Sequence, residues 1–144
     1  MSDKIYTLIT GATGAIGNSI ARLIAEKGNY HVSIVGRDEM RTRQTAEALI
    51  QMSGNSSIDY KICDLSIKSE IMELAKRWDK PLHVVVNNAA VTPRLREETH
   101  EGIEMQWATN VLGYFRMMKY FTPILERHAT ARIVNVASYW AGNL

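Results

Sequence analysis

A chain of 144 residues is long enough for one domain with a single hydrophobic core, and we expect residues 1–144 to form that one domain. Its 17 basic and 15 acidic residues give a net charge of +2 without a basic block, so nucleic acid is not an expected partner. The sequence has no secretory signal peptide and no apolar run of about 18 residues, and it therefore predicts a cytoplasmic protein without a membrane span.

The first predicted strand, the apolar run 5–9, leads through a glycine-rich turn at residues 10–17 into a helix. The apolar stripe of that helix is predicted to contain Ile16, Ile20, Leu23 and Ile24. Glycines at this turn let the backbone approach a diphosphate, and the free N–H groups of the helix N-terminus attract its charge. We therefore predict a dinucleotide site with contacts from Gly11, Thr13, Gly14, Ile16 and Gly17. The alternative is a tight turn in which the small residues serve packing alone.

Strands and helices then alternate along the chain. Strands are predicted at residues 31–36, 58–63, 83–87 and 132–137. Helices are predicted at residues 38–52, from an N-cap at Ser66 to the break at residues 80–81, and at residues 101–127 with a kink or interruption near Pro123. Residues 91–100 read as an exposed loop. Because right-handed crossovers join successive strands, the pattern predicts an α/β fold, a doubly wound parallel Rossmann sheet of about five strands.

Neither the cysteine nor the histidines indicate a metal site. Cys63 is the one cysteine of the chain, which excludes an internal disulfide and a site built from several thiolates. We interpret it as a small buried residue at the end of a strand. No pair of the four histidines has the spacing of metal ligands, so no metal is predicted.

Ligands of such sheets bind beyond the carboxyl ends of the strands. Arg37 and Asp38 follow the second predicted strand. An arginine at this point pairs with the 2′-phosphate of NADP, whereas an acid binds the ribose hydroxyls of NAD. Arg37 lies 20 positions after Gly17, and we therefore favour NADP over NAD.

Polar residues also follow the third and fourth strands. Asp64 can accept a hydrogen bond from the adenine amino group while Leu65 covers the ring. The alternative for Asp64 is a loop or capping role. Asn88, Ala89 and Ala90 again permit close approach of the backbone to a cofactor. Asn87 can simply tie two strand ends together.

Two further polar residues are candidates for a role in chemistry. Asn110 lies in an apolar helical stripe, where the alternative is a hydrogen-bonded core asparagine. Ser138 follows the fifth predicted strand, and a serine at that point can face the ligand cleft or serve the loop.

Taken together, these motifs resemble the short-chain dehydrogenase/reductase family over essentially the whole chain. The resemblance rests on TGATGAIG at residues 10–17, Asp64-Leu65, NNAA at residues 87–90, the Asn110 segment and IVNVAS at residues 133–138. The segments WATNVLGYF and RIVNVAS are most similar to the branch of retinol dehydrogenases and related carbonyl reductases.

The resemblance implies an NADP-dependent oxidoreductase that reduces a carbonyl or oxidises an alcohol on a small-molecule substrate. It implies that Ser138 hydrogen-bonds the substrate oxygen and that Asn110 helps to hold a water in a proton relay. In the family a tyrosine supplies the proton, and a lysine four residues later lowers the pKa of that tyrosine.

The sequence departs from this family pattern. No tyrosine of the chain has a lysine four residues later, and the expected pair would lie beyond Leu144. We therefore expect a truncated, cofactor-binding N-terminal part of a reductase that is inactive alone. Ala15 and Ala90 replace common glycines, so each adds one methyl group near the cofactor.

Two other functions remain open at this point. The missing pair also fits a non-catalytic dinucleotide-binding sensor or regulatory module. The spacing TGxxGxxG is shared with epimerase-like relatives, but the segments around Asn110 and Ser138 argue against an epimerase. A sheet that ends at the fifth strand exposes an edge, and we expect a homo-oligomer.

Overall fold

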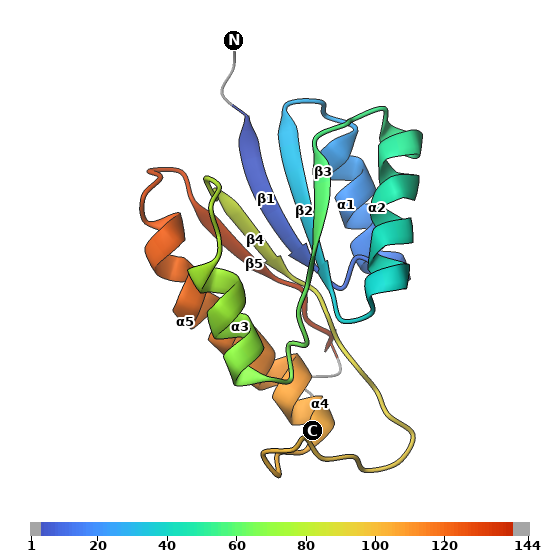
Figure 1. Cartoon of the computed structure of the whole chain (residues 1–144), viewed down its shortest axis with the longest axis vertical. Coiled ribbons are helices and arrows are strands. Elements are labelled where there is room, and N and C mark those ends of the chain that lie inside the picture. The colour runs from blue at the N-terminus through green and yellow to red at the C-terminus, as the bar shows by residue number, and fades with distance from the viewer. Residues whose placement is uncertain (1–3, 140–144) are drawn as a thin grey trace.

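Short apolar runs in this chain form strands, and the amphipathic segments between them form helices (Figure 1). The computed structural model describes residues 4–139. The strands are β1 (Ile5–Thr10), β2 (Tyr30–Gly36), β3 (Ile58–Ile62), β4 (Val84–Asn87) and β5 (Arg132–Asn135). The helices are α1 (Ala15–Ala25), α2 (Glu39–Ser53), α3 (Lys68–Lys76), α4 (Met105–Trp107) and α5 (Gly113–Leu125), and a π-helical turn, η1 (Ala108–Leu112), joins the last two.

The five strands form one parallel sheet in the order β3-β2-β1-β4-β5. The chain runs outward from β1 to β3 and then crosses back to add β4 and β5 on the other side of β1. Ile9 of β1 pairs with Ile34 of β2 and with Val86 of β4, so the three carboxyl ends meet at one edge. The predicted Rossmann sheet is confirmed, and the strand order reverses between β1 and β4, where such folds bind ligands.

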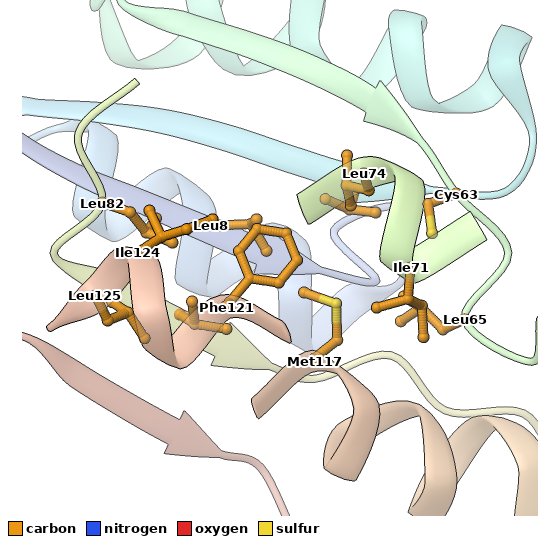
Figure 2. Packing of buried hydrophobic residues seen from close by; sticks show 12 residues of the cluster. Leu8, Cys63, Leu65, Ile71, Leu74, Leu82, Met117, Phe121, Ile124 and Leu125 are labelled. Atoms are coloured by element: carbon orange, nitrogen blue, oxygen red, sulfur yellow. The ribbon is translucent and has the colours of Figure 1, made fainter. Parts of the chain in front are cut away.

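Alternate side chains of the strands enter two separate hydrophobic cores. Leu8 and Val85 face α3 and α5, whereas their neighbours Ile9 and Val86 face α1 and α2. In the first core the fully buried Phe121 of α5 lies among side chains from β1, α3 and the chain before β4 (Figure 2). The two faces of the sheet are therefore both covered, as parallel sheets require.

The buried face of α1 differs from the predicted stripe. Gly17, Ala21 and Ala25 are its buried residues, whereas Ile16 and Leu23 are each 64% exposed. Small residues let the helix axis lie close to the sheet, and this close approach turns the larger residues outward. The prediction for Ile16 and Leu23 was wrong for this reason.

Two other helical predictions need correction. Ser66 does not cap α3, because Ile67 is the N-cap residue and the Ser66 side chain donates to Asp64 instead. The predicted helix 101–127 begins only at Met105, and its irregularity is the π-helical turn around Asn110. Pro123 lies in the last turns of α5 without ending the helix, since a proline near a C-terminus removes only one late hydrogen bond.

The outer edges of the sheet are β3 and β5. All four residues of β5 are exposed, including Ile133 at 37% and Val134 at 46%. Within residues 4–139, no helix combines the length and the apolar character needed to cross a membrane.

Candidate functional site

The glycine-rich turn has its shape because the end of β4 lies against it. Gly11 has a φ of +73°, a left-handed conformation that favours glycine. A Cβ atom on Gly11 would lie 2.6 Å from the Cα of Ala89. A Cβ atom on Gly17 would lie 2.5 Å from the side-chain nitrogen of Asn88 and in closer conflict with the carbonyl oxygen of Gly11. Close packing therefore requires glycine at positions 11 and 17, as the packing alternative supposes.

Asn88 holds this turn in place. Its Nδ2 donates to the carbonyl oxygens of Thr10 (3.1 Å) and Gly11 (3.2 Å). In return, the Thr10 hydroxyl accepts from the backbone N–H groups of Asn88 (3.0 Å) and Ala89 (3.1 Å). The side chain of Asn88 is thus a structural tie between β1 and β4.

The N-terminus of α1 is open towards the same side. Its N-cap residue, Gly14, provides no side-chain hydrogen bond, and no acidic residue lies in the first turn of this helix. A Cβ atom on Gly14 would meet only the Gly11 carbonyl oxygen, at 3.6 Å, so packing does not require this glycine. N–H groups and a helix dipole without a capping carboxylate form a site for an anion.

A groove of about 480 Å³ runs from this helix end across the carboxyl ends of the strands. Every residue that the sequence predicts as a cofactor contact lines it: Gly11, Thr13, Gly14, Ile16, Gly17, Arg37, Asp64, Leu65, Asn88, Ala89 and Ala90. The sequence interpretation missed other lining residues, among them Arg41, Val91 and Thr109. The geometry brings the predicted set together, and their binding roles stay predictions.

One end of the groove is lined by Arg37, Arg41 and Asp38, two positive groups and one negative group. Asp38 is committed to α2, because its carboxylate caps the helix by accepting from the backbone N–H of Arg41 (2.8 Å). Arg37 and Arg41 both line the groove, and within the described residues neither guanidinium has an ion pair. The position of Arg41 in the first turn after a capping aspartate was a signal for this second cation in the sequence.

Asp64 has the loop role that the sequence left open, and it also lines the groove. Its Oδ1 accepts from the backbone N–H (2.9 Å) and the hydroxyl (2.7 Å) of Ser66. Its own N–H donates to a carboxylate oxygen of Glu70 (2.6 Å). Leu65 is 6% exposed and lines the groove beside it.

Asn110 and Ser138 do not line the groove. The side chain of Asn110 is half-buried and hydrogen-bonded to the backbone of Val91, and its role in a proton relay stays a prediction. Asn87 ties two strand ends through its Nδ2, which donates to Oδ1 of Asn135 (2.8 Å). Ser138 is exposed beyond β5.

Two groups, Cys63 of the groove lining and Tyr114 of α5 outside that lining, have raised pKa values. Burial raises the pKa of the Cys63 thiol to about 12, and the carboxylates of Glu70 and Asp64 add to the shift. Burial also raises the pKa of Tyr114, whose phenol donates to the carbonyl oxygen of Val136 (3.2 Å).

Comparison with known families decides the classification. The family model described as short chain dehydrogenase matches residues 6–143. The chain belongs to the short-chain dehydrogenase family. Among curated members of this family, it is 32% identical over 133 residues to dehydrogenase/reductase SDR family member 12 of Bos taurus. This alignment covers 91% of this chain and 42% of that protein. It is 33% identical over 134 residues to retinol dehydrogenase 12 of Mus musculus, with 91% and 42% coverage. The chain thus spans less than half the length of these relatives.

Solved structures of family members share the fold. An alcohol dehydrogenase from Thermococcus sibiricus, complexed with 5-hydroxy-NADP, superposes with a TM-score of 0.82 at 28% identity, over 99% of this chain and 61% of that one. A short-chain dehydrogenase from Sphingobium yanoikuyae, in complex with NADPH, superposes with a TM-score of 0.77 at 28% identity, over 94% of this chain and 54% of that one.

Proposed function

We propose that this chain binds NADP(H) in the groove and contributes the cofactor-binding part of an oxidoreductase. The observation that carries the proposal is the charge of the groove: an uncapped helix end for the diphosphate, and the two guanidinium groups of Arg37 and Arg41 for the 2′-phosphate. The NADPH-bound and 5-hydroxy-NADP-bound relatives support this choice over NAD.

The proposed reaction is reduction of a carbonyl or oxidation of an alcohol on a small molecule. When bound, the nicotinamide supplies the hydride. Gly14 and the first turn of α1 bind the diphosphate, and Asp64 and Leu65 bind the adenine. Ser138 binds the substrate oxygen, and Asn110 helps to hold a water in a proton relay.

The proton donor is not among the residues of this sequence, because no tyrosine is followed by a lysine four positions later. We propose that the 144-residue chain therefore binds the cofactor without turning over carbonyl substrates. The same observation favours a second candidate, a non-catalytic dinucleotide-binding module. Activity of a longer form of this protein, in which further chain supplies the tyrosine and the lysine, would separate the two candidates. Only the enzyme would then turn over a carbonyl substrate.

The test is titration of the purified chain with NADPH and NADH, followed by nicotinamide fluorescence. We expect NADPH to bind at least tenfold more tightly, since each contact to a phosphate is charge-assisted. Equal binding of the two cofactors contradicts the NADP assignment, and binding of neither contradicts the proposal as a whole. Turnover of carbonyl substrates by the chain alone contradicts the missing proton donor.

We also propose that the chain forms a homo-oligomer. The exposed β5 strand offers unpaired backbone groups at one edge, and Trp107, Val111 and Phe115 are exposed at a spacing of four residues along η1 and its flanking helices. Sedimentation equilibrium tests this, and a monomer at all concentrations overturns it.

A further inference from the structure

The turn at residues 64–66 is held by a partner far away in the sequence. Arg116 of α5 donates from Nη1 to the carbonyl oxygen of Ser66 (3.2 Å), across 50 positions of sequence. Its Nη2 lies 3.6 Å from a carboxylate oxygen of Glu101, in the segment that precedes α4. The Arg116 side chain is only 11% exposed, so it is a nearly buried cation with one carbonyl and one carboxylate partner.

Local contacts fix the internal shape of this turn but not its position. Asp64 accepts from Ser66 through its side chain and from the backbone N–H of Ile67 (3.0 Å) through its carbonyl. These bonds all lie within four residues, and they would move with the turn if it shifted against the groove. Contacts with other elements fix its position: the Asp64 N–H donates to Glu70 of α3, and the Cys63 N–H donates to the Gly36 carbonyl oxygen at the end of β2 (3.0 Å).

Helix α5 contacts the carbonyl groups of the turn at two further points, one helical turn apart. A Cβ atom on Gly113 would lie 3.0 Å from the carbonyl oxygen of Leu65, so the helix backbone lies directly against the turn. Arg116 then binds the next carbonyl, that of Ser66. These two contacts act on the carbonyl groups of Leu65 and Ser66, and so on the turn whose Asp64 and Leu65 line the groove.

We propose that Arg116 is a positioning residue for the adenine end of the groove. By holding the Ser66 carbonyl, it sets the distance from the Asp64 carboxylate to the adenine amino group and the seat of Leu65 on the ring. This inference rests on the proposed function, because it assigns a residue that acts behind the proposed adenine contacts without touching the cofactor.

The experiment compares NADPH with its hypoxanthine analogue, which lacks the amino group that would donate a hydrogen bond to Asp64. Binding of both to the 144-residue chain is measured by nicotinamide fluorescence for wild type, Arg116→Met and Arg116→Lys. The matched control is Lys119→Met, which removes an exposed positive charge from the same helix and lies outside the groove lining. Thermal unfolding of each variant reports stability separately.

We expect wild type to prefer NADPH over the analogue by about tenfold, the value of one charge-assisted hydrogen bond. Arg116→Met should reduce this preference to below about twofold, whereas Lys119→Met should keep it in full. Arg116→Lys should recover part of the preference, because an ammonium group can still donate to the Ser66 carbonyl. A residue with a merely structural role would lower the unfolding temperature and leave the ratio unchanged.

Two outcomes overturn the inference while the proposed binding of NADP(H) in the groove stands. One is wild type that binds NADPH without preferring adenine, and the other is Arg116→Met that keeps the full preference. If Arg116→Met does not fold, Arg116→Lys takes its place: a preference smaller than that of wild type supports the inference, and an undiminished preference overturns it. Wild type that binds neither cofactor overturns the proposed function itself.

Discussion

The side chain of Asn110 bonds to the backbone of Val91 in both directions. Its Oδ1 accepts from the Val91 N–H (2.8 Å), and its Nδ2 donates to the Val91 carbonyl oxygen (2.9 Å). Asn110 lies within the π-helical turn η1, and Val91 lines the groove just after β4. This pair therefore joins the irregular turn of the helix to the wall of the proposed cofactor site.

Removal of this pair should destabilise the fold. Asn110→Ala loses two hydrogen bonds, and we expect it to lower the free energy of unfolding by about 2 kcal/mol. Asn110→Asp keeps the acceptor but sets a carboxylate oxygen against the Val91 carbonyl oxygen, so its loss should be at least as large as that of Asn110→Ala. Urea unfolding measures both, with the exposed Gln106→Ala as control. If Asn110→Ala is as stable as Gln106→Ala, the pair does not stabilise the chain.

The same pair explains where sequence interpretation of the helices failed. Periodicity predicted one helix over residues 101–127 with a defect at Pro123, because proline is a visible signal. The observed defect is at Asn110, where the helix widens and a side chain bonds a strand-end loop 19 residues earlier. A contact of that kind leaves no trace in helical spacing, whereas the apolar runs of the strands predicted every strand to within two residues.

The glycines of the first turn differ in what a methyl group would meet. Gly17→Ala would place a carbon 2.5 Å from the Asn88 side-chain nitrogen and against the Gly11 carbonyl oxygen, and we expect a loss of about 1–3 kcal/mol in stability. Gly14→Ala meets nothing closer than 3.6 Å, so its stability should change by less than about 0.5 kcal/mol. Thermal unfolding of the two variants checks this, and equal losses would show that the close contacts relax without cost.

The glycines at residues 11, 14 and 17 show what the sequence could and could not predict about the site. The glycine pattern placed the turn and the groove, because a strand, three glycines and a helix leave few arrangements of the backbone. It did not show which glycine faces the ligand. Gly11 and Gly17 are needed for packing against the end of β4, and Gly14 is free of that constraint. The difference depends on β4, some 70 residues later, and only the fold reveals it.

Arg37 and Arg41 should determine cofactor choice together. Arg37→Ala and Arg41→Ala should each weaken NADPH binding by about tenfold and leave NADH binding within about twofold, because only NADPH carries the 2′-phosphate. Arg43→Ala is the matched control, since Arg43 lies on α2 near Glu47 and outside the groove lining. Fluorescence titration gives the constants. Weakening of both cofactors by the same factor would place the phosphate elsewhere.

The Cys63 thiol should be unreactive towards alkylation in the folded chain. It is 2% exposed, and its pKa is raised to about 12 by burial and by the nearby carboxylates of Glu70 and Asp64. At pH 8 only about one thiol in ten thousand is a thiolate, the form that reacts. Iodoacetamide at pH 8 should therefore label the native chain far more slowly than the urea-unfolded chain. Equal labelling rates would show that the end of β3 opens readily.

Acid should destabilise the chain through His31, at the end of the sheet opposite the groove. Burial lowers the pKa of His31 below 6.5; the carboxylate of Asp59 opposes this shift, and the charge of Lys80 adds to it. The unfolded chain then binds a proton at His31 more readily than the folded chain does. The contribution of His31 to stability is complete above about pH 6.5 and is lost as the pH falls towards the lowered pKa of the folded state. Urea unfolding of wild type and His31→Gln at pH 7.5 and 5.5 measures this loss. Wild type should lose more stability between the two pH values than His31→Gln, because glutamine does not titrate. Because the two proteins differ at this residue alone, the other effects of pH are common to both, and equal losses would show that His31 takes up its proton without cost to the fold.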